Sequence, residues 1–290
     1  MQKKFFSFVQ NVCYELFIRN AEFLKKYLIL KLIFAKIFLK ANIILLKFIK
    51  IMFFTTLIAI FFSIGFFFES IFGFGGGLIS FALLGFFLEI KEMILVGLYI
   101  GTLSSSYIAF TSRKHFEVKI FVKLIPLALL GSIIGVYGFM YFSAEKLSLI
   151  FAIILFFLAI KMIFFDHYKF PKLLKNKFLL IGAISQGAFG IGGPFIVSVV
   201  KNDFKSKSSL RATMAVYFVF CNVLRIIQMF FADKLKIEFF AEIAWTIIPV
   251  FIAIYFGHLV HLKIKDDVFK KGVSIIILLA SINFMFKALK

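Results

Sequence analysis

One apolar segment is interrupted by Glu69-Ser70-Ile71-Phe72-Gly73-Phe74-Gly75-Gly76-Gly77-Leu78-Ile79. A second is interrupted by Gln186-Gly187-Ala188-Phe189-Gly190-Ile191-Gly192-Gly193-Pro194-Phe195-Ile196. The two align without gaps 117 residues apart, the separation of Gly73 and Gly190, and Glu69 corresponds to Gln186. Inside a helix, glycine costs about 1 kcal/mol and proline about 3 kcal/mol relative to alanine, which makes these clusters poor choices for simple membrane anchors. Matching breaks in two halves of a membrane chain indicate a transporter's binding site.

The composition indicates a membrane protein. Of the 290 residues, 62% are hydrophobic and 46 are phenylalanine, whereas an ordinary soluble domain is roughly 45–50% apolar. Several apolar stretches reach about 20 residues, which is enough to cross a hydrocarbon layer about 30 Å thick. The net charge of +20 does not favour nucleic-acid binding, because the basic residues mostly flank apolar runs. We therefore expect membrane lipid as a partner and no nucleic acid.

Residues 1–50 differ from the rest of the chain. They carry ten basic residues against two acidic ones, a net charge of +8, and their lysines recur through apolar residues from Tyr27 to Lys50. This pattern predicts a basic amphipathic helix in the membrane interface rather than a span. No uninterrupted apolar run leads to a small-residue cleavage site, so a signal peptide is not indicated. Met52 is an alternative start, and the sequence does not decide between these interpretations.

The remainder predicts an all-α polytopic membrane protein, because backbone groups in lipid must be satisfied within helices. We expect a first transmembrane repeat at 51–165, a cytoplasmic link at 166–177 and a second repeat at 178–288, with four helices in each repeat. The eight predicted crossings are 51–88, 93–112, 120–142, 145–165, 178–200, 209–232, 237–260 and 266–288. The first and fifth contain the glycine-rich breaks.

Charge in the loops predicts the orientation. Basic residues gather near 113–119 and in the link, whereas the loops near 89–92 and 145–146 are acidic or neutral. This pattern places the N-terminus and the link in the cytoplasm. An eight-crossing chain then leaves the basic segments 201–211 and 263–271 outside. If residues 178–200 instead enter the membrane and return, both segments become cytoplasmic, but the halves would lose their equivalence. The eight-crossing arrangement is the one predicted here.

Neither metal nor disulfide chemistry is indicated. Cys13 and Cys221 fall in the basic N-terminal region and in a predicted span, so they should lie far apart. His258 and His261 can share a helical face but have no third ligand nearby. We therefore expect no metal, no cofactor and no catalytic residues.

Polar residues within the spans are the remaining candidates for a site. Asn222, Arg225 and Gln228 share one face of the sixth helix. A charge inside the membrane is costly and normally faces a protein interior or a water-filled cavity, so Arg225 either binds an anionic oxygen group or snorkels to the interface or pairs with Glu69. Glu69 itself is either a proton-coupling carboxylate or that static partner. Helix packing is the simpler explanation for Ser104, Ser105 and Ser106.

The chain resembles the TauE/SafE family of membrane transporters over roughly 52–288. The matching features are Gly73-Phe74-Gly75-Gly76-Gly77, Gly190-Ile191-Gly192-Gly193-Pro194, and the opening Ser208-Ser209-Leu210-Arg211-Ala212-Thr213 of the sixth helix. The resemblance implies a multi-pass inner-membrane transporter for sulfite, organosulfonates or related anions.

A broken helix exposes N–H groups and the positive end of a helix dipole, so the half-helices starting near Gly77 and Pro194 are candidate anion sites. The predicted substrate-binding residues are Glu69, Gly73, Gly75, Gly76, Gly77, Gln186, Gly190, Gly192, Gly193, Pro194, Asn222 and Arg225. The chain lacks a Walker motif, so the function indicated is secondary transport of a small anion by a non-enzyme. The alternatives are an intramembrane enzyme, for which Ser70 and Ser185 lack a histidine base, and a non-transporting assembly protein. The substrate, direction, coupling ion and oligomeric state are left open.

Overall fold

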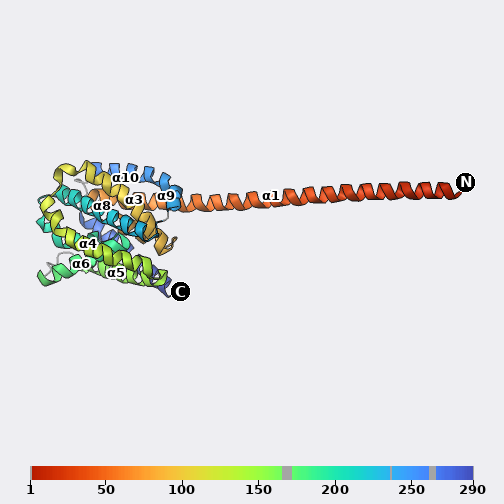
Figure 1. Cartoon of the computed structure of the whole chain (residues 1–290). Helices are drawn as coiled ribbons and strands as arrows, with labels where there is room; N and C mark the ends of the chain where they lie inside the picture. Colours follow the sequence, from red (N-terminus) through yellow and green to blue (C-terminus); the bar gives the residue numbers. More distant parts are fainter. Residues whose placement is uncertain (1, 165–171, 236, 261–265, 290) are drawn as a thin grey trace. The chain divides into compact units, whose positions relative to one another are not determined.

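A computed structural model describes residues 2–164, 172–235, 237–260 and 266–289. Within these ranges the chain is helical and contains no strand. The long helices are those expected from apolar runs that must satisfy their own backbone groups in lipid. The elements are α1 (Gln2–Phe72), α2 (Gly76–Leu84), α3 (Ile90–Thr111), η1 (Arg113–His115), α4 (Val118–Tyr141), α5 (Ala144–Phe164), α6 (Lys172–Phe189), α7 (Gly193–Val200), η2 (Lys201–Asp203), α8 (Lys207–Phe231), α9 (Ile237–Ile243), η3 (Ala244–Thr246), α10 (Ile247–Val260) and α11 (Asp266–Ala288) (Figure 1).

The chain divides into two compact units, Met1–Phe54 and Thr55–Lys290. In the first unit the helix is continuous, and the side chains of residues 36–50 are exposed whether apolar or basic. Its placement in the membrane interface stays a prediction. Residues 166–171 of the predicted link lie outside the described residues, and Lys172 begins α6.

The first glycine cluster reverses the direction of the chain. The Ser80 hydroxyl of α2 donates to the carbonyl oxygen of Phe61 at 3.2 Å, across 19 residues. A straight helix would separate these residues by about 28 Å, at about 1.5 Å per residue. The rings of Phe62 and Phe81 also pack with their centroids 6.1 Å apart. Helix α2 therefore returns along α1, and the two form a helical hairpin.

The second glycine cluster does the same. The rings of Phe178 on α6 and Phe195 on α7 lie with centroids 6.2 Å apart, although 17 residues of straight helix would span about 25 Å. A Cβ added to Gly182 would lie 2.9 Å from the Cβ of Phe195, so a glycine is needed where the two helices approach. Helix α7 therefore returns along α6.

Three longer helical segments follow each hairpin, and they pack across the two halves of the second unit. Helix α5 packs along α11, α4 along α6 and α3 along α8; Figure 1 shows α4 beside α6. Glycines allow the close approach of α4 and α6, since a Cβ added to Gly135 would lie 2.4 Å from the backbone nitrogen of Ala188. Such small residues are typical of helix contacts in membranes.

Contacts between helix ends identify two sides of this unit. At one side, the N–H of Glu117 donates to the Thr213 hydroxyl at 3.0 Å, which joins the loop after α3 to the start of α8. The end of α5, η2 and α11 meet there too, because Lys161, Lys201 and Val273 line one cavity. We call this the link side. At the opposite side, the Asn283 amide of α11 donates to the carbonyl oxygen of Gly85 at 2.8 Å.

The prediction of eight crossings is not confirmed. Among the described residues, six helices are long and apolar enough to cross a membrane, and they are Lys36–Phe72, Ile90–Thr111, Val118–Tyr141, Ala144–Phe164, Lys207–Phe231 and Phe240–Val260. A shorter apolar helix covers Val273–Ala288. The segments 51–88 and 178–200, expected to cross once, each contain a glycine turn that sends the chain back toward its side of entry.

This arrangement makes a prediction about residue 205, which eight simple crossings would place opposite residues 114 and 175. Single cysteines at positions 114, 175 and 205, in a chain with Cys13→Ser and Cys221→Ala, should be labelled by an impermeant maleimide from the same membrane side. A cysteine at position 146 should be labelled from the other side. Labelling of position 205 together with position 146 would contradict the hairpin formed by α6 and α7.

Candidate functional site

The turns of the two hairpins meet inside the second unit. A Cβ added to Gly77 would lie 3.3 Å from the carbonyl oxygen of Gly190. One added to Gly193 would lie 3.1 Å from the Cβ of Phe74. Both distances are shorter than ordinary van der Waals contact, so glycine at these positions allows one hairpin to approach the other closely. Two breaks that lie more than a hundred residues apart in the sequence therefore form one structure.

Each hairpin turn begins with the same local structure, although the matched residues Gly75 and Gly192 then differ, with φ of 95° and −69°. Gly73 and Gly190 follow the ends of α1 and α6 with φ of 83° and 77°, a left-handed conformation that residues other than glycine seldom adopt. Their N–H groups donate to the carbonyl oxygens four residues earlier, those of Glu69 at 2.7 Å and Gln186 at 3.0 Å. The gapless sequence match thus reflects a shared way of ending a helix.

The side chains of Glu69 and Gln186 then bind the start of the returning helices. The Gly76 N–H donates to Oε2 of Glu69 at 2.8 Å, and the Gly192 N–H donates to Oε1 of Gln186 at 2.9 Å. Both side chains are buried, with 5% and 2% of their surfaces exposed. The carboxylate and the amide therefore make similar contacts that are one residue out of register, because Gly192 is the counterpart of Gly75 and not of Gly76.

These contacts correct the prediction that the N–H groups at the starts of the half-helices are unpaired. We expected their N–H groups to be open to a substrate anion, near Gly77 and Pro194. The N–H groups of Gly76 and Gly192 instead have side-chain oxygens as partners. An oxygen acceptor at a helix start satisfies a group that would otherwise be unpaired in a water-poor interior. Any anion at this site therefore needs a further donor.

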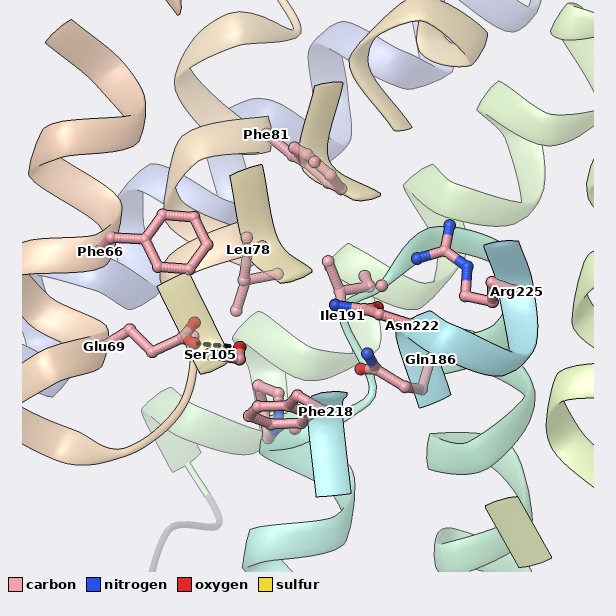
Figure 2. Close-up of a pocket in the computed structure, with 17 residues that line it drawn as sticks. Phe66, Glu69, Leu78, Phe81, Ser105, Gln186, Ile191, Phe218, Asn222 and Arg225 are labelled. Carbon is pink, nitrogen blue, oxygen red and sulfur yellow. Dashed lines mark hydrogen bonds between the residues drawn. The ribbon is translucent and has the colours of Figure 1, made fainter. Parts of the chain in front are cut away.

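A cavity of about 30 Å³ lies between the breaks. It is lined by Phe66, Glu69, Gly75, Gly77, Leu78, Phe81, Gly97, Gly101, Ser105, Gln186, Gly190, Ile191, Gly193, Pro194, Phe218, Asn222 and Arg225. Figure 2 shows Glu69 and Ser105 on one side of this central cavity, and Gln186, Asn222 and Arg225 on the other. The walls are mostly apolar and glycine, with a few polar groups between them, as is usual for small-ligand sites.

Arg225 has the unpartnered donors that such a site would require. Its side chain is 1% exposed, and its Nε and Nη2 atoms are buried without a hydrogen-bond partner among the described residues. The missing side chain at Gly190 makes room for it, because a Cβ there would lie 3.0 Å from Nη1. Buried donors normally have partners, so these two N–H groups indicate a place for an acceptor.

The alternative explanations for Arg225 do not fit this geometry. It does not snorkel, because it is buried. Nor does it pair with Glu69, whose carboxylate accepts hydrogen bonds from the Gly76 N–H and, at 3.4 Å, from the Ser105 hydroxyl. Within the described part of the chain no ion pair joins Glu69 and Arg225, which face each other from opposite sides of the cavity (Figure 2).

Nine of the twelve residues predicted from the sequence line this cavity. They are Glu69, Gly75, Gly77, Gln186, Gly190, Gly193, Pro194, Asn222 and Arg225. The other three are Gly73, Gly76 and Gly192. Gly73 packs against the Cα of Arg211, which a Cβ would approach to 2.7 Å. Gly76 and Gly192 act through the N–H groups described above.

The sequence did not identify the rest of the lining. Ser105 was assigned to helix packing, but its hydroxyl contacts Glu69. Phe66, Phe81 and Phe218 could not be distinguished among 46 phenylalanines. Gln228 shares a helix face with Arg225 but donates from Nε2 to the Ser132 hydroxyl at 3.0 Å, and it does not line the cavity.

The histidines and the candidate serine nucleophile have other contacts. His258 Nδ1 lies 2.8 Å from Nη1 of Arg211, and His261 lies outside the described residues. No group of three metal-binding side chains occurs in the searched, described part of the chain. The Ser70 hydroxyl donates to the carbonyl oxygen of Ile254 at 2.8 Å and accepts from Arg211 Nη2 at 3.3 Å. Neither of these two partners of the Ser70 hydroxyl is a histidine.

Comparison with known proteins gives one match. The family model described as "Sulfite exporter TauE/SafE" matches residues 57–284, which include both hairpins and all the residues that line the central cavity. No curated protein and no solved structure matches the chain. Since the family model covers most of the sequence, this protein belongs to the TauE/SafE sulfite exporter family of membrane transporters.

Proposed function

We propose that this protein is a secondary transporter that moves a small sulfur-containing or organic anion across the inner membrane, with the substrate held between the two hairpin turns. The observation that carries the proposal is Arg225, which is buried beside the central cavity and has two nitrogens without a hydrogen-bond partner in the described part of the chain. Membership of a transporter family supports the class of activity.

The chemistry of arginine favours an oxyanion as the ligand. Placing a charge at the centre of a membrane helix costs about 2.5–3.5 kcal/mol on insertion scales, and a bound anion would offset part of that cost. Guanidinium presents its donors in a planar fork that matches two oxygens of one acid group. Sulfite, sulfonate and carboxylate groups all supply such oxygens. Asn222 Nδ2, one turn away on α8, is a further potential donor beside the cavity.

The two halves support an alternating-access mechanism. Each begins with a helical hairpin, α1–α2 or α6–α7, and three longer helical segments follow. The first hairpin enters from the side opposite the link and the second from the link side, so the proposed repeats have inverted topology. In this arrangement the second unit begins opposite the link, whereas the loop charges predicted that the N-terminus and the link share one side. Substrate sites at the interface of inverted repeats, near broken helices, are a recurring arrangement in secondary transporters.

The basic residues fit a cytoplasmic link side. Arg113, Lys114, Lys119, Lys172, Lys175, Lys177, Lys201, Lys205 and Lys207 all belong to loops or helix ends at that side. Cytoplasmic loops carry an excess of Lys and Arg. The basic segment 201–211, which eight crossings would leave outside, joins the link once the second hairpin returns.

Glu69 supplies a means of coupling to protons. It lines the same cavity as Arg225, and an anion bound there would meet a second negative charge in a poorly screened environment. Protonation of Glu69 removes that repulsion, so proton and anion would bind together. The equivalent Gln186 makes the same type of N–H contact without a charge. The hydrogen bond therefore does not require a carboxylate, which leaves the charge available for function.

The first test concerns Arg225. Arg225→Gln should lower anion flux about 10- to 100-fold, the effect of losing a charged hydrogen bond worth about 1.5–3 kcal/mol. Arg225→Lys should restore only part of the flux, because the planar fork is lost. The measurement is uptake of sulfite, thiosulfate, sulfonates and carboxylates into proteoliposomes, normalised to folded protein.

The control for this test is Arg113→Gln, which removes the same charge from an exposed position at the link side. It should leave the flux unchanged. Wild-type flux in Arg225→Gln would refute the proposed site. Loss of folded protein in both Arg225 variants would favour a non-transporting assembly protein in which Arg225 stabilises packing.

The second test concerns coupling. Glu69→Gln should fold, because Gln186 shows an amide in the equivalent role. It should lose accumulation driven by a pH gradient but retain exchange of labelled for unlabelled anion, since only the proton site is removed. Both fluxes are measured in proteoliposomes with and without an imposed pH gradient.

Glu92→Gln, a change at an exposed carboxylate near the start of α3, is the matched control and should behave as wild type. Accumulation driven by the pH gradient in the Glu69→Gln variant would show that Glu69 is not the coupling group.

A further inference from the structure

A second and larger cavity adjoins the central one at the link side. Its volume is about 200 Å³, and it shares Gly75, Leu78 and Pro194 with the central cavity. The shared residues come from the first turn and the first helices of the two returning segments. We call this second cavity the vestibule.

The walls of the vestibule are mainly apolar, and three lysines stand among them. Lys161 is in the last turn of α5, Lys201 begins η2 and Lys207 begins α8. The described lining contains no Asp or Glu. Three cationic groups from separate elements, with low-dielectric walls between them, raise the local concentration of anions. Their aliphatic stems can also cover apolar surface.

Leu78 lies between the two spaces. Its side chain is 2% exposed, and Figure 2 shows it within the central cavity, between Glu69 and Ile191. Pro194 contributes to both linings from the other hairpin. Gly75, Leu78 and Pro194 therefore border both cavities, and we expect a solute that passes between them to meet these residues.

We propose that the vestibule is a second anion site, which collects an organic anion with an apolar body and a sulfonate or carboxylate head from the link side and delivers it to Arg225. The lysines bind the head group, and the apolar walls accept the body. The delivery of the anion to Arg225 rests on the proposed function. The existence of the anion site can be tested without any transport.

The test uses Ser198→Cys, which places a thiol on the vestibule wall, in the background Cys13→Ser and Cys221→Ala. The probes are the anionic reagent sulfonatoethyl methanethiosulfonate and its trimethylammonium counterpart. The anionic reagent should react faster than its cationic counterpart, after both rates are normalised to those with free cysteine. The combined change Lys161→Gln, Lys201→Gln and Lys207→Gln should lower that ratio about tenfold or more.

Lys205→Gln is the matched control. Lys205 lies between Lys201 and Lys207 in the sequence and is exposed, but it does not line the vestibule. Lys205→Gln should leave the ratio unchanged. Hexanesulfonate should slow the reaction of Ser198→Cys, and ethanesulfonate should do so less, because it has less apolar body. An unchanged ratio in the triple variant, or an equal fall in Lys205→Gln, would overturn the proposal.

An anionic lipid headgroup shares this chemistry, so the labelling is repeated in vesicles with and without phosphatidylglycerol. We expect the same ratio in both. Suppression of labelling by phosphatidylglycerol would show a lipid site instead. If the ratio of anionic to cationic labelling changes as proposed but the Arg225 variants transport normally, the vestibule is supported as an anion site and the central site is refuted. If the ratio is unchanged in the triple lysine variant, the vestibule is refuted as an anion site, whatever flux the Arg225 variants show.

Discussion

Backbone groups that lose their helical partners inside a membrane must find others, and the second unit depends on how this chain meets that constraint. Each glycine cluster ends one helix and starts another at a depth where water is scarce. Glu69 and Gln186, each four residues before its left-handed glycine, accept the N–H at the start of the returning helix. Without these contacts, the hairpin turns would leave polar groups buried and unpaired, at a cost of several kcal/mol each in lipid.

The side chains that satisfy the turns also place polar groups in the interior of the second unit. The two turns are narrow because they consist largely of glycine, so they can approach each other at backbone distance. The space beside them holds a carboxylate, an amide and a guanidinium that are all nearly inaccessible. Stability alone would favour apolar side chains there, because replacing buried ions by packed hydrophobic groups is often neutral or stabilising. Glu69 and Gln186 have a structural role in the turns, whereas Arg225 has two buried nitrogens without a partner among the described residues, which the proposed ligand would satisfy.

The halves share a backbone arrangement but differ in charge. Glu69 and Gln186 occupy matching positions, yet only one of them can take up a proton, and Arg225 lies across the cavity from that one (Figure 2). The three lysines of the vestibule extend the asymmetry toward the link side. In the proposed mechanism, this difference in charge lets a proton and an anion bind at separate positions, so that they do not compete for the same site.

The sequence by itself determined the helical class, the membrane environment, the family resemblance and most of the residues around the central cavity. Composition and glycine spacing are local properties, and they do not depend on how the helices pack. The tertiary structure decided the direction of the chain after each break, since 51–88 and 178–200 have the same apolar content whether they cross once or turn back. It also decided that Ser105 contacts Glu69, that Arg225 stays apart from Glu69, and that Lys161, Lys201 and Lys207 share one cavity. These relations join residues that are distant in the sequence, and only packing between helices brings such residues together.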